Sequence, residues 1–162
     1  MRKSNILLTI LFAVAVMVTG AVGADLYNNA TAIQVVASVN AGTGDTPLVG
    51  TVVDGSGYKS VTYVINIGDL DDTDATFTVL LEDCEEVACD TTNAAVADTY
   101  LYGTEALASF TVADNNSTKM LGYAGVKRYS RMTITPANNT GTDVNLGAVA
   151  VRGHPQYAPV TH

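Results

Sequence analysis

The sequence predicts an all-β protein, either an antiparallel β-sandwich or a jelly-roll-like fold of about eight or nine short strands. After residue 25 the apolar residues recur with a period of two, and no helix-length amphipathic stretch interrupts them. Polar turn signals such as "DGSG" and "DNNST" separate these segments at short intervals. Alternating strands with frequent turns are typical of two packed antiparallel sheets.

The expected strands follow one another from residue 31 to residue 153. The segment 31–39 comes first, and the segment 60–68 then places Val61 and Tyr63, with the two isoleucines after them, on one face. The segment 75–83 repeats this alternation with a phenylalanine, a valine and a leucine. The remaining expected strands are residues 98–104, 108–113, 118–125, 127–136 and 142–153.

The first 24 residues differ from the rest of the chain. They begin with Arg2 and Lys3, continue without charge from Ser4 to Ala24, and end on small residues. This order predicts a secretory signal peptide, which would make the mature protein exported. The alternative is a retained hydrophobic leader that anchors the chain, because the apolar run nearly matches the thickness of a bilayer. Residues 25–162 are expected to form a single β-sandwich domain.

The two cysteines, Cys84 and Cys89, lie in "DCEEVACD". Their spacing is too wide for a thioredoxin-type motif, and the chain's two histidines are too few to complete a zinc site with them. In an exported protein we expect a disulfide that closes a short loop; two unpaired thiols are the alternative. The surrounding segment 84–97 also allows a short helical turn.

Charge is low overall and unevenly placed. The net charge is −8 and the pI is about 4.4, which argues against nucleic acid or an anionic membrane surface as a partner. Residues 60–118 hold most of the acids and no Lys or Arg, whereas residues 119–131 hold four bases and no acid. Segregated charge of this kind can join copies head to tail, although both segments can equally be solvated turns.

No catalytic constellation is present in the sequence, and we expect neither enzymatic activity nor a cofactor. His154 lies between a glycine and a proline, and His162 is the last residue. The acidic turn "DLDDTD" offers carboxylates for a cation but lacks the glycine and the distal glutamate of an EF-hand loop, so a solvated turn is the favoured interpretation. The candidate ligands in this turn are Asp69, Asp71, Asp72 and Asp74.

The end of the chain carries a recognisable pattern in "MLGYAGVKRYSRMTITP" and "NLGAVAVRGHPQYAPV". It resembles a group of small structural proteins of tailed bacteriophages, encoded among the virion genes near the major capsid protein. The resemblance covers roughly residues 25–160, and its tail motif is more specific than its front half. The matching residues are Gly122, Tyr123, Gly125, Lys127, Arg128, Tyr129 and Arg131, followed by Gly147, Ala148, Gly153, His154, Pro155, Ala158, Pro159 and Val160.

This resemblance implies a non-enzymatic structural protein that self-assembles or docks on a protein lattice. It would be a capsid decoration or head–tail component of a virion, or an exported filament or surface-layer subunit of that type. Its partners would be copies of itself or a capsid or surface lattice protein, with membrane contact only through an uncleaved leader. The expected subunit interface comprises Lys119, Tyr123, Lys127, Arg128, Tyr129, Arg131, His154, Pro155 and Tyr157, the last three in an extended C-terminal arm.

A second hypothesis belongs to a different class. An exported β-sandwich can also act as a monomeric binding module for a glycan or another surface ligand. The oligomeric state of the mature protein distinguishes the two.

Overall fold

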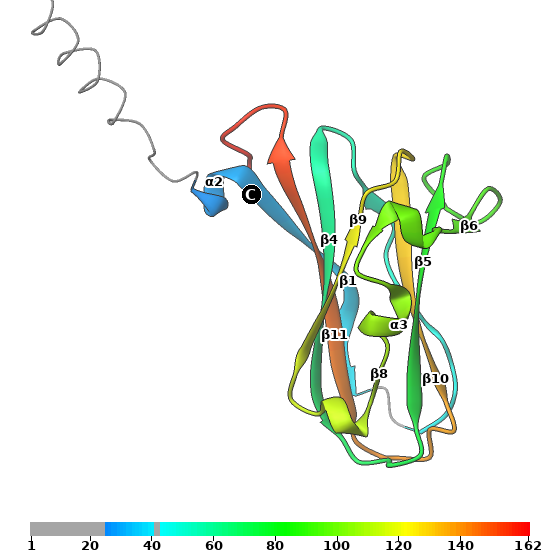
Figure 1. Ribbon diagram of the computed structural model, residues 1–162. Coiled ribbons are helices and arrows are strands. Elements are labelled where there is room, and N and C mark those ends of the chain that lie inside the picture. Colours follow the sequence, from blue (N-terminus) through cyan, green and yellow to red (C-terminus); the bar gives the residue numbers. More distant parts are fainter. Residues whose placement is uncertain (1–24, 41–42) are drawn as a thin grey trace, which may run out of the picture.

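A computed structural model describes residues 25–40 and 43–162 (Figure 1). Two antiparallel sheets face each other, which confirms the predicted all-β antiparallel sandwich. The described residues form eleven strands, more than the eight or nine expected, because five of them are only two residues long. The expected signal peptide, residues 1–24, lies outside the described residues.

The first sheet has five strands in the order β1-β11-β4-β9-β7. All of its neighbouring strands are antiparallel, and β11 lies between the first strand and β4. The last strand, β11, therefore lies inside the sheet, between the first strand at its edge and β4. The bounds are β1 Ala30–Asn40, β4 Tyr58–Leu70, β7 Leu101–Tyr102, β9 Thr118–Tyr123 and β11 Val144–Pro155.

The second sheet has six strands and is built around one long antiparallel pair, β5 and β10. β2 and β3 extend β10 on its other side, and β6 and β8 extend β5. The bounds are β2 Leu48–Val49, β3 Val53–Asp54, β5 Thr76–Cys84, β6 Ala94–Ala95, β8 Phe110–Thr111 and β10 Tyr129–Ala137.

The core lies between the sheets and consists of the alternate residues that the sequence pattern indicates. Tyr63 and Ile65 of β4 face Leu81 of β5 and Met132 of β10 across it, all fully buried. The hydroxyl of Tyr63 has a partner in this interior, because it shares a hydrogen bond of 2.7 Å with Ser130. The large apolar side chains thus stabilise the sandwich without leaving that hydroxyl unpaired.

The segments expected as strands at 98–104 and 108–113 are only partly strands. Side-chain caps favour short helical turns there: Thr104 accepts from Leu107 N, and Thr111 accepts from Ala113 N. Glu105 also accepts a hydrogen bond of 2.6 Å from Leu81 N, so that the turn covers the edge of β5. The helical elements are α2 Leu26–Asn29, η1 Asp98–Tyr100, α3 Glu105–Ala108 and η2 Val112–Asp114.

None of the helices in the described ranges is long and apolar enough to cross a membrane.

The predicted disulfide between Cys84 and Cys89 is confirmed, and both cysteines are buried. It closes the start of the loop between β5 and β6, which contains bends and one hydrogen-bonded turn, Cys89 N donating to Glu86 O at 3.2 Å, but no helix. Glu86 holds the rest of this loop by accepting hydrogen bonds from the backbone N–H groups of Asp90, Thr91 and Thr92. The bonds from Thr92 N and Thr91 N lower the pKa of Glu86 to about 2.

Candidate binding cleft at one end of the sandwich

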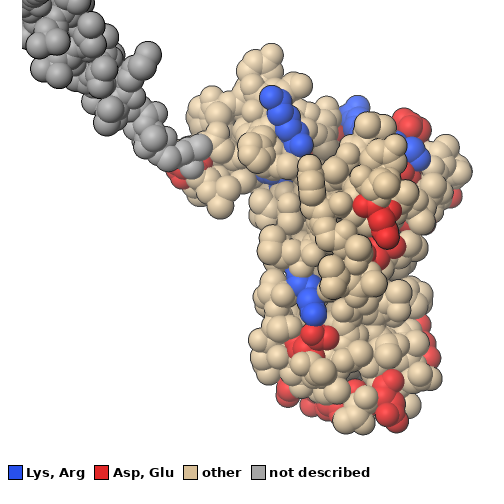
Figure 2. Space-filling model, in the orientation of Figure 1, with Lys and Arg blue, Asp and Glu red and all other residues tan. Residues whose placement is uncertain are grey.

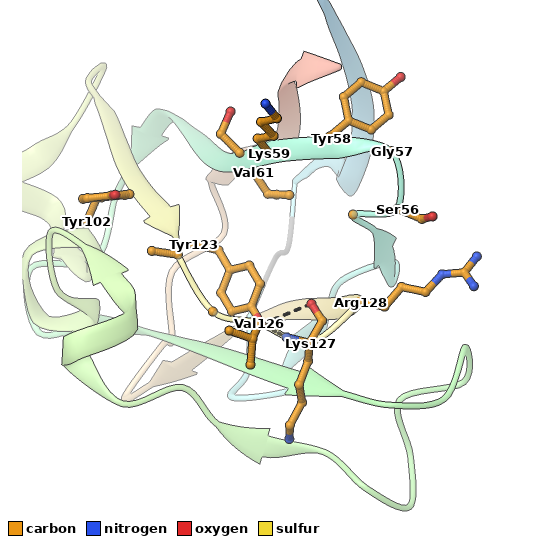
Figure 3. Close-up of a pocket in the computed structure, with 14 residues that line it drawn as sticks. Ser56, Gly57, Tyr58, Lys59, Val61, Tyr102, Tyr123, Val126, Lys127 and Arg128 are labelled. Carbon is orange, nitrogen blue, oxygen red and sulfur yellow. Dashed lines mark hydrogen bonds between the residues drawn. The ribbon is translucent and has the colours of Figure 1, made fainter. Parts of the chain in front are cut away.

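An open cleft of about 520 Å³ lies at the end of the sandwich where β4 and β10 begin. The turn 55–57 together with the first residues of β4 forms one side, and the loop 124–128 forms the other. Val61 and Tyr123 contribute from β4 and β9 (Figure 3). Tyr102, from the edge strand β7, completes the lining. The cleft therefore combines segments that are far apart in the sequence.

The turn between β3 and β4, residues 55–57, is held in one conformation by local hydrogen bonds. Asp54 accepts from Ser56 N at 2.8 Å, and Tyr58 N donates to Gly55 O at 3.1 Å. Gly57 has φ +83, a backbone conformation that residues with a Cβ rarely adopt. The glycine turn "DGSG" thus positions the side chains that follow it at the mouth of the cleft.

The opposite loop is anchored on the side chain of Tyr123. The Tyr123 hydroxyl donates to Asp83 Oδ2 at 2.9 Å and accepts from Lys127 N at 3.1 Å. Burial and the neighbouring Asp83 raise the pKa of this phenol. A Cβ on Gly125 would overlap the Tyr123 ring, so glycine is required for the loop to fold over it. The two loops are also joined directly, by Gly55 N donating to Arg128 O at 2.8 Å.

Besides Tyr123, two tyrosines line the cleft, and one of them, Tyr102, leaves its ring surface open. Tyr102 is 74% exposed and rests with its first side-chain carbon against Gly122, which offers no side chain of its own. Tyr58 is half-buried, and the guanidinium of Arg152 lies over its ring at 4.4 Å from the centroid. Exposed aromatic faces beside a hollow are surfaces on which a flat, partly apolar ligand can pack.

Three cationic side chains and no carboxylates line the cleft. The cations are Lys59, Lys127 and Arg128. Lys127 is paired with Asp83 at 3.0 Å, and Arg128 forms a two-pronged contact with Asp54 at 2.9 and 2.7 Å. That contact lowers the pKa of Asp54 and raises the pKa of Arg128. Lys59 is exposed and has no hydrogen-bond or ion-pair partner among the described residues.

The four bases that the sequence analysis assigned to a subunit interface all form ion pairs within the chain. Lys119 pairs with Asp114 at 2.7 Å, and Arg131 pairs with Glu82 at 3.0 Å, in addition to the two pairs at the cleft. Three of the four acidic partners come from the acid-rich segment 60–118. The attraction between the acidic and basic segments therefore acts inside one molecule, and segregated charge no longer argues for assembly.

The other expected interface residues lie at different places. Tyr123 is 8% exposed and presents little surface to a second subunit, whereas Tyr129 is half-buried beneath the guanidinium of Arg128. His154 Nδ1 shares a hydrogen bond of 3.0 Å with Ser60, and Pro155 ends β11. Tyr157 is 86% exposed on the C-terminal arm. An interface role for these residues stays a prediction.

The acidic turn expected as a solvated loop lies at the opposite end of the sandwich. Asp72 accepts hydrogen bonds from Thr140 N at 2.7 Å and Asp74 N at 2.9 Å, and these lower its pKa to about 2. Asp71 accepts from Thr142 N at 3.1 Å. Within the described residues no group of three or more acids, cysteines or histidines is arranged to hold a metal ion.

Sequence reasoning did not find the cleft residues Tyr58, Lys59 and Tyr102. The signal for the first two was the glycine turn followed at once by "YKS", since a turn that ends in an aromatic and a base presents both at a strand terminus. Tyr102 gave no such signal, because its place beside the cleft depends on the pairing of β7 with β9.

A second, smaller depression of about 160 Å³ lies on the outer face of the five-stranded sheet. It forms where Gly147 carries no side chain and Ser38 approaches to 3.0 Å of the position that a Cβ would take. Val64 and Val149 border it, and Met120, 61% exposed, extends from β9 next to Val64 in the strand register. The lining mixes these apolar side chains with the uncharged polar residues Gln34, Ser38 and Asn66, and it lacks the charged groups of the cleft.

No family model matches this chain. No curated protein matches it either. Among solved structures it is similar to a carbohydrate-binding module, CBM35 from Cellvibrio japonicus Abf62, with 11% identity, a TM-score of 0.38, and coverage of 82% of this chain and 100% of the module. It is also similar to the CBM22-1–GH10 modules of Clostridium thermocellum xylanase 10B, in complex with xylohexaose, with 11% identity, a TM-score of 0.34, and coverage of 84% of this chain and 28% of that one. TM-scores this low establish no shared family, so the cleft itself supports the function proposed below.

Proposed function

We propose that the chain is a non-catalytic binding module that holds a saccharide in the cleft between residues 55–59 and 124–128. The single observation that supports this is an open cleft of about 520 Å³ with the exposed ring of Tyr102 at its side. A volume of this size suits a small ligand or a short stretch of a polymer.

The chemistry of the lining fits a sugar. A pyranose ring has an apolar face of C–H groups and a periphery of hydroxyls. The Tyr102 ring can pack against that face, while the hydroxyls of Ser56 and Ser60 and the cations of the lining can bind the periphery. Groups that bind hydroxyls are present on the cleft wall, and the acids nearest to it, Asp54 and Asp83, already form ion pairs.

The cleft is also shaped before any ligand enters. The loops are fixed by the Asp54–Ser56 turn, the Tyr123 hydroxyl and the direct bond between Gly55 and Arg128. A preformed site loses less conformational entropy on binding, so modest contacts can give measurable affinity.

The test is titration calorimetry of the purified protein against a panel of neutral and acidic oligosaccharides, followed by Tyr102→Ala. We expect at least one saccharide to bind, and Tyr102→Ala to weaken it about tenfold because a stacking surface is lost. Tyr157→Ala is the matched control, since Tyr157 is also largely exposed but lies outside the cleft. Absence of binding across the panel, or equal effects of the two variants, would refute the proposal.

An exported location follows from the leader in this proposal. A secretory leader would carry the module out of the cell, and the Cys84–Cys89 disulfide suits an oxidising compartment. N-terminal sequencing of the native protein should find a start near Ala24 or Asp25; a start at Met1 would contradict cleavage.

A second candidate function is a subunit of a protein lattice, as the virion-type tail motif implies. The observation that favours it is the exposure of apolar side chains on the outer face of the five-stranded sheet, where Met120 is 61% and Val149 37% exposed. Light scattering should then show oligomers, and the substitution Met120→Lys should dissociate them. Val87→Lys is the control, because Val87 is 70% exposed in the disulfide loop. This candidate would be excluded if the protein were monomeric at all concentrations and if imaging did not find it on purified virions.

A further inference from the structure

The charge of the cleft is opposite to that of the chain. The protein has a net charge of −8, yet the cleft lining holds three cations and neither aspartate nor glutamate. On the face shown in Figure 2, acidic side chains gather toward the end away from the cleft and along one edge. A cationic hollow in an acidic protein indicates a ligand with negative charge.

The unused hydrogen-bond donors of the cleft can be identified. Lys127 is engaged by Asp83, and Arg128 uses Nε and Nη2 on Asp54, which leaves its Nη1 for another acceptor. Lys59 has all three N–H donors available among the described residues. The cleft therefore offers one unneutralised positive charge, at Lys59.

We propose that the saccharide bound in the cleft is acidic, and that Lys59 binds its carboxylate while Tyr102 packs against a sugar ring. This inference rests on the proposed function and specifies its ligand class. A uronic or sialic acid sugar carries one carboxylate for each acidic ring, which matches a single free ammonium. Arg128 Nη1 supplies a second donor for the carboxylate or a neighbouring hydroxyl.

The surroundings disfavour a densely charged polyanion. Asp54 and Asp83 lie directly behind Arg128 and Lys127, so a second or third phosphate would approach carboxylates as well as cations. The rest of the acidic surface would repel a long nucleic acid at distances up to the Debye length. One carboxylate beside Lys59 avoids both costs.

The experiment compares two acidic saccharides, trigalacturonic acid and sialyllactose, each with its methyl ester. The ester keeps the ring and the hydroxyls but removes the charge. Affinities are measured by titration calorimetry at low and at high salt for the full protein, for Lys59→Gln and for Lys119→Gln. The last variant changes the net charge equally, but at a residue outside the cleft.

We expect at least one acid to bind about tenfold tighter than its ester at low salt, the size of one charge-assisted hydrogen bond, with a smaller preference at high salt. Lys59→Gln should abolish that preference, so that acid and ester bind about equally, whereas Lys119→Gln should preserve it. Because Lys59 is exposed, its substitution should leave the fold intact, which thermal unfolding checks.

The outcomes separate the two proposals. If acids and esters bind equally, or if Lys59→Gln retains the preference, the acidic ligand is wrong while a neutral saccharide in the cleft stands. If esters and neutral oligosaccharides bind through Tyr102 but the acids do not, the same conclusion follows. If neither acidic nor neutral saccharides bind, both proposals are overturned.

Discussion

The two ends of the sandwich hold their loops together in different ways. At the end opposite the cleft, residues 71–75 and 138–143, the carboxylates of Asp71 and Asp72 accept hydrogen bonds from the facing loop. At the cleft end, the cations of one loop pair with acids beneath them, and the Tyr123 hydroxyl joins loop and strand. The first end is filled by its own contacts, whereas the second encloses a hollow.

This difference teaches how polar residues can be assigned to structure or to binding. Four aspartates close together in the sequence offered carboxylates for a cation, although a solvated turn was the favoured interpretation. The structure uses the oxygens of Asp71 and Asp72 within the chain. Lys59, a single base that follows a glycine turn, was not predicted as a binding residue, yet among the described residues its ammonium donors are free at the cleft. Polar groups that line a cleft and have no partner within the chain are better candidates for binding than polar groups that are only clustered in the sequence.

The largest effect on stability should come from the side chain that organises the cleft end. Tyr123→Ala should lower the free energy of unfolding by about 3 kcal/mol, because it removes a buried ring and leaves a cavity. Tyr123→Phe should cost about 1 kcal/mol through loss of the bonds to Asp83 and Lys127. Urea unfolding measures both. Equal losses would show that the ring itself contributes little.

The disulfide loop should come next. Replacing Cys84 and Cys89 by alanine should lower the free energy of unfolding by about 2 kcal/mol, the entropy expected for closing a short loop. Chemical denaturation under oxidising conditions measures this effect, and wild-type protein with a reductant is the matched comparison. A stability equal to that of the wild type would mean that the bonds to Glu86 suffice to order the loop.

A smaller, pH-dependent effect should distinguish the two ends. The folded pKa values of Asp72 and Glu86 are both about 2, below their usual 3.8 and 4.5. A carboxyl group whose pKa is lower in the folded than in the unfolded state stabilises the fold when the pH is above the unfolded pKa. This contribution is lost as the pH falls through the folded pKa. Melting temperature should therefore decline between roughly pH 4.5 and pH 2.

Variants assign that decline to one end. Asp72→Asn should flatten it more than Glu86→Gln, because the loop of Glu86 begins with a disulfide that does not depend on protonation, whereas the far-end loops have no such link. Differential scanning calorimetry across this pH range provides the measurement. A greater flattening by Glu86→Gln would reverse the contrast drawn between the two ends.

The smallest effect on stability should come from Tyr102. Since this side chain is 74% exposed, Tyr102→Ala should change the free energy of unfolding by less than about 0.5 kcal/mol. The same variant should weaken saccharide binding, whereas Asp72→Asn at the far end should leave binding unchanged. A large loss of stability in Tyr102→Ala would show that the ring supports the fold rather than a ligand.

Much of the fold could be predicted because alternation is a local property. The apolar alternation at 60–68 and 75–83 marks β4 and β5, and the turn signals mark their ends. The segments around residues 98 to 114 were mistaken for strands because Thr104 and Thr111 act as helix caps, and two-residue strands leave little room for a pattern.

The site could be predicted only in part, because its residues meet through strand pairing. Arg131 stands directly opposite Glu82 in the register of β10 and β5, so the basic segment meets an acid of its own chain. Because the sequence does not reveal this strand pairing, the separated acidic and basic segments suggested an attraction between molecules. Tyr123, Lys127 and Arg128 were singled out from their motif, but their common cleft with Lys59 and Tyr102 depends on both sheets.

The stacking of Tyr27 on His162, at 4.3 Å between ring centroids, joins the first and last described elements at the cleft end (Figure 1). Val160 N also donates to Asn28 O at 3.0 Å, so the described chain comes close to forming a ring. A circular permutant should therefore fold when a short glycine linker connects these ends and the chain is opened in the exposed turn at Thr73. Such a permutant would carry any fused reporter on the end opposite the cleft and leave the mouth of the cleft unobstructed.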